Sequence, residues 1–191
     1  MKKNAFTLAE VLITLGIIGV VAALTIPTLM QKTNDKEISA AIKKSFANIS
    51  NAIQLAEAEH GSIKSLDDVE YNYNNELGIN GSNYIYIKYI MDNLKIVKAC
   101  GYYGRGCFAD SYDKESVTED LYSMSGCYNF ILADGSALCI RDGEAYPTFI
   151  LDINGQKGPN KDGVDFVGEF SFNTDTGKLE PNSYIKRILM E

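Results

Sequence analysis

The stretch that decides the fold is Lys2-Lys3-Asn4-Ala5-Phe6-Thr7-Leu8-Ala9-Glu10, which is followed by a run without charged residues from Val11 to Gln31. The 25 residues from Phe6 to Met30 rise about 37 Å as a helix, which is enough to cross a hydrocarbon core of roughly 30 Å. No acid compensates Lys2 and Lys3 before Glu10, so these lysines are expected to stay on the cytoplasmic side. The sequence therefore predicts one transmembrane span at residues 6–30 and an exported head.

Glu10 disfavours two simpler interpretations of this segment, a plain membrane anchor and a secretory signal peptide that ends at Val21-Ala22-Ala23. The apolar run continues past that site to Met30. A carboxylate at the membrane-entry end costs about 2–3 kcal/mol unless something compensates it. A cut between Ala5 and Phe6 would create a positive α-amine, which could pair with Glu10 of a neighbouring copy. We therefore interpret the segment as an assembly device.

These residues resemble the N-terminal signature of type IV pilins and of the pseudopilins of type II secretion and competence systems. In that family a prepilin peptidase cuts before a Phe, the Phe is N-methylated, and a Glu four residues later pairs with the amine of an adjacent subunit. The resemblance implies that Ala5 and Phe6 flank the cut and that Glu10 is the pairing carboxylate. It covers the first 30 of the 191 residues. Ala5 departs from the usual Gly of the family, which bears on the efficiency of processing.

Pro27 lies where many members of that family have a helix-bending proline. A proline inside a helix removes one hydrogen bond and clashes with the preceding turn. Gly16 and Gly19 loosen the same stretch by roughly 1 kcal/mol each relative to alanine. We expect this section to kink, or to melt when it is packed in a filament.

Residues 31–60 form the second half of the same predicted helix. Apolar residues recur there at intervals of three or four, as one stripe made of Ile38, Ile42, Phe46, Ile49, Ile53 and Ala56. The stripe is expected to pack against a sheet, because it has too few heptads for a free coiled coil. The helix is expected to end near His60-Gly61, where glycine favours a left-handed cap. We interpret His60 as a solvated cap residue rather than a ligand or catalyst.

The remaining chain, residues 61–191, is predicted to form one globular head. Gly61–Ser82 is typical of a connecting loop, and Tyr84–Leu94 has the spacing of a short helix, with Ser82 or Asn83 as its cap. Asp134-Gly135 between two apolar runs predicts a tight hairpin. Strands are expected at 95–100, 128–132, 137–140, 148–153 and 166–172. The predicted fold class is α+β, with the long N-terminal helix of a pilin-like protein packed on a small antiparallel sheet.

The four cysteines, Cys100, Cys107, Cys127 and Cys139, all follow the apolar segment. An even number in an exported region indicates two disulfides, and pairing of near neighbours is favoured among three connectivities. A zinc site is disfavoured, since there is no CxxC and the single histidine, His60, is distant in sequence. Residues 101–106 are interpreted as a cross-linked clasp, with a partner-binding loop as the alternative.

Residues 152–165 hold oxygen donors at Asp152, Asn154, Asp162 and Asp165, which suit a hard cation such as Ca²⁺. The loop is similar to C-terminal loops of pseudopilins, some of which bind calcium. It fails the EF-hand pattern, because Lys157 stands at the sixth position and Gly163 at the twelfth. A metal-free hairpin loop is therefore the favoured interpretation, with Ca²⁺ as the alternative.

Charge and motifs restrict the function. The chain has 25 acidic and 18 basic residues, two of the basic ones in the leader 1–5, and there is no strong nucleic-acid signal. It lacks a Walker loop, GxSxG and HExxH, so no enzyme is predicted, although a hydrolase head on a membrane stalk is an alternative.

The function predicted is that of a structural subunit of a type IV pilus or of a type II secretion pseudopilus. A competence (DNA-uptake) pseudopilin and a membrane-tethered binding module that does not polymerise are alternatives. Expected partners are other pilins in a homo- or hetero-oligomeric filament, the prepilin peptidase and the inner-membrane assembly machinery. The expected location is the inner membrane, and then a periplasmic or extracellular filament.

Overall fold

The computed structural model describes residues 7–66, 70–72, 82–102, 104–112, 127–141 and 147–190. The predicted leader, the two residues that flank the predicted cut (Ala5 and Phe6), and Tyr103 of the predicted clasp lie outside these ranges. The chain divides into two compact units, residues 1–39 and 40–191. Each unit is described separately.

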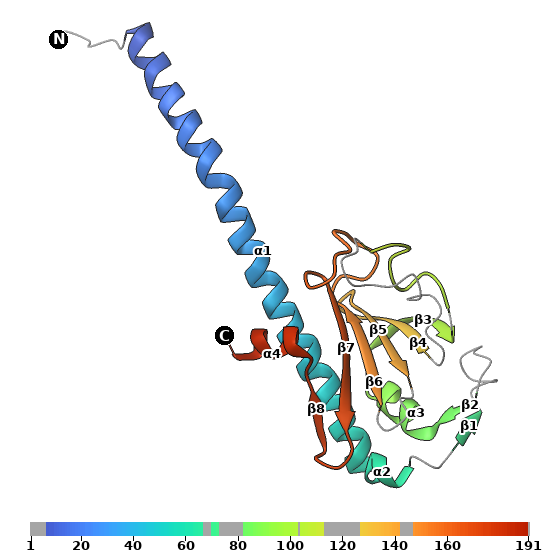
Figure 1. Cartoon of the computed structure of the whole chain (residues 1–191). Helices are drawn as coiled ribbons and strands as arrows, with labels where there is room; N and C mark the ends of the chain where they lie inside the picture. The colour runs from blue at the N-terminus through green and yellow to red at the C-terminus, as the bar shows by residue number, and fades with distance from the viewer. Residues whose placement is uncertain are drawn as a thin grey trace, which may run out of the picture. The chain divides into compact units, whose positions relative to one another are not determined.

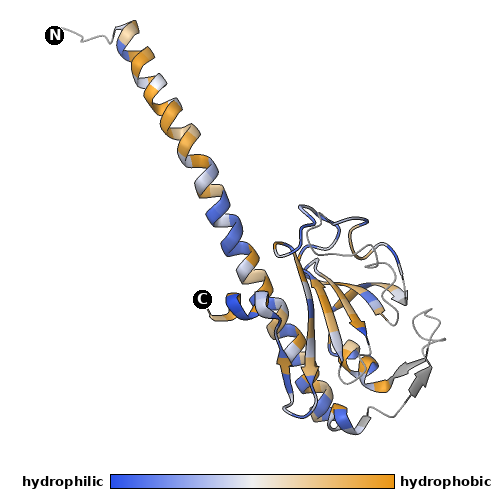
Figure 2. Ribbon diagram, in the orientation of Figure 1, coloured by the Kyte–Doolittle hydropathy of each residue, from blue (hydrophilic) through white to orange (hydrophobic). Residues whose placement is uncertain are grey.

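In the first unit, helix α1 (Leu8–His60) contributes its residues up to Ser39. The helix is long and apolar enough to cross a membrane, and its most apolar window is fully exposed in the described chain. Figure 2 shows this hydrophobic run in the first part of α1. The backbone is helical through Gly16, Gly19 and Pro27. Melting at Pro27 inside a filament stays a prediction.

In the second unit, the remainder of α1 carries the apolar stripe into the head. Ile42, Ile49 and Ile53 are almost completely buried, and the ring of Phe46 lies 5.7 Å from that of Phe170. Helix α1 ends at His60, because Gly61 has a φ of +93° and donates its N–H to Glu57 O at 2.9 Å. This left-handed glycine cap ends the helix at His60-Gly61, as predicted.

Between α1 and the main sheet lie short elements: α2 (Ile63–Leu66), β1 (Glu70–Asn72), β2 (Ser82–Tyr84) and α3 (Ile85–Asp92). Strands β1 and β2 pair in antiparallel fashion. The prediction of a loop over Gly61–Ser82 is wrong where the chain is described, because a three- or four-residue element has no periodicity to detect. The short helix was correctly predicted, although it begins one residue later, after Tyr84 has ended β2.

The main sheet has six antiparallel strands in the order of the chain, β3 to β8 (Figure 1). The bounds are β3 Ile96–Tyr102, β4 Cys127–Leu132, β5 Ala137–Arg141, β6 Thr148–Asp152, β7 Phe166–Asn173 and β8 Lys178–Glu180. The predicted strands and the hairpin at Asp134-Gly135 are confirmed, and Gly135 has a φ of +90°. Strand β8 and helix α4 (Ser183–Met190) were not predicted, because both are short.

Both faces of the central strands are buried. On one face Ile140 pairs with Phe149, and Phe149 pairs with Phe170, which contacts Phe46 of α1. On the other face Cys139 pairs with Ile150. A second core cluster covers that face, made of Ala109, Tyr112, Cys127, Cys139, Ile150 and Phe166. The described part of the β3–β4 connection therefore covers the sheet opposite α1, and this explains the continuous apolar sequence of β5 and β6.

Candidate functional site

The first turn of α1 is closed by a reciprocal pair of hydrogen bonds between Thr7 and Glu10. The backbone N–H of Thr7 donates to Glu10 Oε2 at 2.9 Å, and the N–H of Glu10 donates to Thr7 Oγ1 at 3.3 Å. The Thr7 hydroxyl also donates to Glu10 Oε2 at 2.9 Å. This is a capping box, in which two N–H groups that have no helical partner are satisfied by side chains. It was not predicted from the sequence, although Thr7-x-x-Glu10 is its signature.

The capping box gives Glu10 a role within its own chain. Its Oε2 accepts both bonds from Thr7, while Oε1 has no hydrogen bond to another described residue. Glu10 is exposed at the start of an exposed apolar helix. The carboxylate can therefore accept a further cationic donor at Oε1 without opening the cap.

The threonines of the apolar run are satisfied by their own helix. Thr14 Oγ1 donates to Glu10 O at 2.9 Å, Thr25 Oγ1 to Val21 O at 2.9 Å and Thr28 Oγ1 to Leu24 O at 3.4 Å. A hydroxyl in hydrocarbon without a partner would cost several kcal/mol, roughly 4–8 against cyclohexane. These backbone bonds make the three threonines compatible with lipid.

The four cysteines form two disulfides, Cys100–Cys107 and Cys127–Cys139. This is the near-neighbour connectivity that the spacing favours. The Cα atoms are 6.0 Å apart in the first pair and 5.7 Å apart in the second, within the usual range for disulfides. Cys127–Cys139 joins β4 to β5, and Cys100–Cys107 anchors the segment that follows β3.

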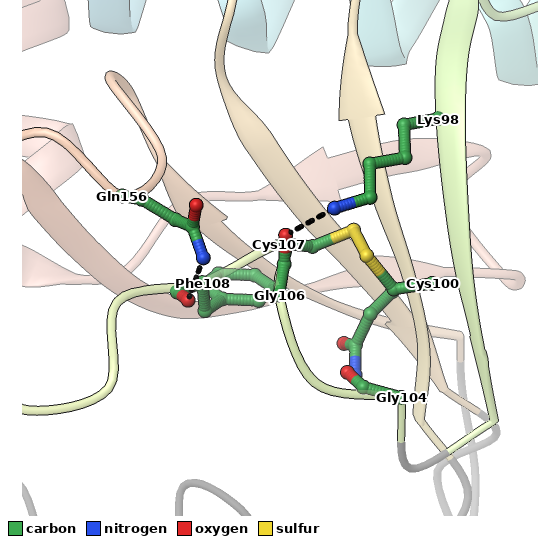
Figure 3. Close-up of a disulfide and its surroundings, with 8 residues drawn as sticks. Lys98, Cys100, Gly104, Gly106, Cys107, Phe108 and Gln156 are labelled. Carbon is green, nitrogen blue, oxygen red and sulfur yellow. Dashed lines mark hydrogen bonds between the residues drawn. A yellow bond between two sulfur atoms is a disulfide. The ribbon is translucent and has the colours of Figure 1, made fainter.

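Hydrogen bonds hold the Cys100–Cys107 segment on the sheet (Figure 3). Lys98 Nζ donates to Gly106 O at 2.8 Å, and Figure 3 shows this bond beside the disulfide. Asn129 Nδ2 of β4 also donates to Gly104 O at 3.1 Å. Gly104 lies so close to the chain that a Cβ there would collide with the Cys100 carbonyl. These contacts favour a structural clasp for the described residues of this segment.

The loop between β6 and β7 is organised by two buried carboxylates. Asp152 Oδ1 accepts the N–H groups of Asn154 at 3.0 Å and Gly155 at 2.8 Å, and its Oδ2 accepts the Tyr112 hydroxyl at 2.6 Å. Because Asp152 is fully buried, burial raises its pKa to about 6, although these three donors oppose that shift. Burial and the facing carboxylate of Asp152 also raise the pKa of Tyr112.

Asp165 holds the other side of the same loop. It accepts the N–H groups of Asn160 at 2.7 Å, Lys161 at 2.6 Å and Phe166 at 3.2 Å, and the amide of Asn154 at 3.2 Å. Two amide oxygens of the loop, Asn154 Oδ1 and Asn160 Oδ1, are buried without a donor among the described residues.

The oxygen donors predicted for Ca²⁺ are only partly brought together. Asn154 bonds to Asp165, and Asp152 accepts the N–H of Asn154. Asp162 is half-buried and pairs its backbone with Phe166. In the described parts of the chain, no three His, Cys, Asp or Glu residues gather as a metal site. The two buried carboxylates already accept N–H and O–H donors, so they are occupied in holding the loop.

His60 does not stand free at the end of α1. Its ring stacks on that of Tyr89 in α3, with centroids 3.5 Å apart and planes 9° from parallel. Nε2 lies 3.7 Å from Glu59 Oε2. This stack joins the end of α1 to α3, and it gives His60 a packing role.

Residues 1–26 match the prokaryotic N-terminal methylation motif, the prepilin-type cleavage and methylation signal of type IV pilins and pseudopilins. This match supports a pilin-like substrate of the prepilin peptidase, and it indicates a structural protein. With the apolar α1, it fits a membrane-anchored protein with an exported head. No curated protein and no solved structure matches the chain. Residues 28–174, well over half of the chain, match the family of unknown function DUF6613, and the protein therefore belongs to that family.

Proposed function

We propose that this protein is a structural subunit of a pilin-type filament, assembled through the first part of α1. The observation that carries the proposal is a methylation motif at residues 1–26 on an exposed apolar helix whose first turn includes Glu10. A secretory leader gains no function from a carboxylate at the start of its apolar segment. A filament subunit does, because the carboxylate can neutralise the amine of its neighbour.

Processing supplies the charge that Glu10 requires. Hydrolysis of the bond between Ala5 and Phe6 leaves a carboxylate on Ala5 and a protonated amine on Phe6, and methylation of that nitrogen retains its positive charge. In a neighbouring subunit, Glu10 Oε1 is open to such a cation while Oε2 keeps its bonds to Thr7. Away from water, an amine–carboxylate pair avoids the large cost of an uncompensated charge.

The head has the features of a stable domain that faces outward. Two disulfides and a sheet covered on both faces suit a domain exposed to an oxidising exterior. We propose other pilin subunits, the prepilin peptidase and the inner-membrane assembly machinery as partners. The proposed locations are the inner membrane and, after assembly, a filament outside it. A type IV pilus, a secretion pseudopilus and a DNA-uptake filament all agree with these observations.

A second candidate is a membrane-tethered binding module, and one surface feature favours it. A cleft of about 440 Å³ lies in the head between the later part of α1, the turn after α3 and the β4–β5 hairpin. It is lined by amide and lysine side chains that include Asn48, Asn51 and Lys95, and by the exposed Leu55. A module that binds a ligand here would have no need of Glu10.

Mass spectrometry of the native N-terminus is the decisive experiment. A filament subunit should begin at Phe6, with a methyl group on its nitrogen. A chain that keeps Met1, or that begins after Ala23, would contradict the proposal and would support an anchor or a signal peptide. Deleting the peptidase in the same host is the control, since it should restore the unprocessed mass.

A further inference from the structure

We propose that the outward face of helix α4 docks on an anionic lipid surface while the subunit is anchored in the membrane. The feature is a basic, apolar-tipped helix on the head of an acidic protein. The inference rests on the proposed membrane anchoring of α1, but it does not depend on filament assembly.

Helix α4 is fixed to the head by its first turn. Asn182 Oδ1 accepts the N–H of Ile185 at 2.8 Å, which is an N-cap, and Asn182 Nδ2 donates to the carbonyls of Val167 at 2.9 Å and Glu169 at 3.0 Å in β7. Ile185 and Ile188 are buried. One face of α4 is therefore fixed in the core, and the opposite face is held outward in a defined orientation.

The outward face combines two cations with an exposed methionine. Met190 is 73% exposed, and Lys186 and Arg187 precede it by four and three residues, so all three lie on one side of the helix. Leu189, at 38% exposure, adjoins this face. Figure 2 shows the hydrophobic residues at the C-terminal end of α4. We call Lys186, Arg187 and Met190 the α4 tip.

The charges of the α4 tip are not neutralised by the described residues of the head. Lys186 and Arg187 form no ion pair within those residues, and Arg187 instead lies 5.5 Å from the ring of Tyr184. The helix contains no acid, whereas the whole chain carries a formal charge of −7. Glu191, which follows Met190, lies outside the described residues. A cationic surface on an acidic protein is complementary to an anionic partner.

The tether makes anionic lipid the partner that fits best. Only residues 31–39 separate the apolar run from the second unit, and a chain of that length reaches at most about 30 Å. The head therefore stays near the headgroups as long as α1 is in the bilayer. Lysine and arginine beside an exposed apolar side chain are the composition of interfacial anchors, in which the cations meet lipid phosphates and the apolar group enters the acyl boundary.

The experiment uses the full chain with a single tryptophan, because the sequence has none. The variant Met190→Trp is reconstituted in phosphatidylcholine vesicles, with or without about one third phosphatidylglycerol. Selective tryptophan emission and quenching by brominated lipid report contact with the bilayer. Val97→Trp is the matched control, since Val97 is also strongly exposed, at 65%, but lies on β3. In the anionic vesicles the emission of Met190→Trp should shift to the blue and be quenched, while the control should stay aqueous.

A second variant tests the charges. In the Met190→Trp background, Lys186→Gln with Arg187→Gln should lower the docked-to-free ratio by about fivefold for each cation, and so by roughly 25-fold together. High salt should act in the same direction. Equal emission in neutral and anionic vesicles would overturn the inference.

Two further outcomes would each point to a different cause. A blue shift that follows the protein-to-lipid ratio, and ignores lipid charge, would overturn the inference in favour of a second protein chain as the partner. Flotation of the vesicles tests the anchoring itself. A chain that fails to float with either vesicle would overturn the proposed anchoring, and docking of α4 with it.

Discussion

Thr7 and Glu10 accept hydrogen bonds from each other's backbone N–H groups, so the residue proposed to pair with a neighbouring subunit also begins its own helix. The two roles make different demands on the side chain. The cap needs an acceptor at the third helical position, and glutamine serves there as well as glutamate. Pairing with an amine needs the negative charge.

This difference predicts the behaviour of two variants. Glu10→Gln keeps the cap but removes the charge, so filament yield should fall to that of Glu10→Ala. Thr7→Val keeps the charge and loses the capping hydroxyl, at a cost of about 1 kcal/mol to the helix start, and it should assemble better than either. Filament yield in sheared-cell fractions, with membrane insertion as the control, measures both. Wild-type assembly by Glu10→Gln would contradict the charge pairing.

Asp152 predicts a pH dependence of the head. Burial raises its pKa to about 6, whereas an aspartate in the unfolded chain titrates near about 3.9. The folded head therefore binds this proton more tightly than the unfolded chain does. The contribution of Asp152 to the free energy of unfolding is fully present below about pH 4 and is lost as the pH rises through about 6.

Asp152→Asn should remove that loss, because the amide carries no charge and Tyr112 can accept its N–H. From about pH 4 to about pH 7.5, the free energy of unfolding of the variant relative to wild type should increase by on the order of 2 kcal/mol. Denaturant unfolding at the two pH values measures it. A difference that does not change with pH would count against the burial effect.

Asp134 is a control for that experiment, because its contribution to stability depends on pH in the opposite direction. Burial alone would raise its pKa, but hydrogen bonds from Ser136 and the ammonium of Lys44 outweigh burial and lower it. Its contribution to stability is therefore present at neutral pH and is lost as the pH falls below its unfolded value. Asp134→Asn should destabilise the head at neutral pH and have little effect in acid.

Gly104→Ala should weaken the Cys100–Cys107 clasp. The new Cβ would collide with the Cys100 carbonyl, so the backbone must move, at a cost of roughly 1–3 kcal/mol or more. Free thiols after oxidative folding and the thermal midpoint report the damage. Gly158→Ala is the matched control, since a Cβ at Gly158 meets nothing within 4 Å. Equal behaviour of the two variants would show that the backbone does not require glycine at 104.

Truncation of the α1 stripe should destabilise the head strongly. Ile49 is fully buried, at 0% exposure, so Ile49→Ala should cost about 2–5 kcal/mol of the free energy of unfolding. Leu55 on the same helix is 51% exposed, and Leu55→Ala should cost less than about 1 kcal/mol. Denaturant midpoints of the two variants, at equal m-values, make the comparison. A larger loss in Leu55→Ala would place the packing face of α1 elsewhere.

Calcium should have little effect on the head. Asp152 and Asp165 are already occupied by N–H and O–H donors, so a cation would have to replace bonds that hold the loop. A site with a dissociation constant one hundredth of the free Ca²⁺ concentration would raise the free energy of unfolding by about 2.7 kcal/mol. A thermal titration with Ca²⁺, with Mg²⁺ as the control, distinguishes the two cases. A rise in midpoint with Ca²⁺ alone would establish the site.

The order of the main elements could be predicted because each is marked either by a periodic pattern over several turns or by a local motif. The apolar stripe of α1 runs over several turns, Asp134-Gly135 marks a hairpin by itself, and Gly61 ends a helix by its left-handed conformation. Both disulfides join near neighbours, which spacing alone can suggest. Each of these features requires no knowledge of distant residues.

The parts that could not be predicted depend on contacts remote in sequence. Strand β8 and helix α4 are short, and Asn182 fixes α4 through carbonyls of β7. Tyr112 reaches Asp152 from the β3–β4 connection, and a lone tyrosine gives no sign of that. The Thr7–Glu10 cap is different, because its spacing is legible in the sequence. The sequence interpretation considers Glu10 only as the partner of a neighbouring subunit, and it therefore misses this cap.

The order of the strands has a consequence for export. Each strand of the main sheet pairs with the strand before it in the chain, and the disulfides span separations of only 7 and 12 residues. With the leader held on the cytoplasmic side, a head that is exported in the order of its sequence can add one hairpin at a time and oxidise each cysteine pair soon after both members appear. Correct pairing then follows from the order of arrival, since Cys100 and Cys107 have both emerged before Cys127 can compete.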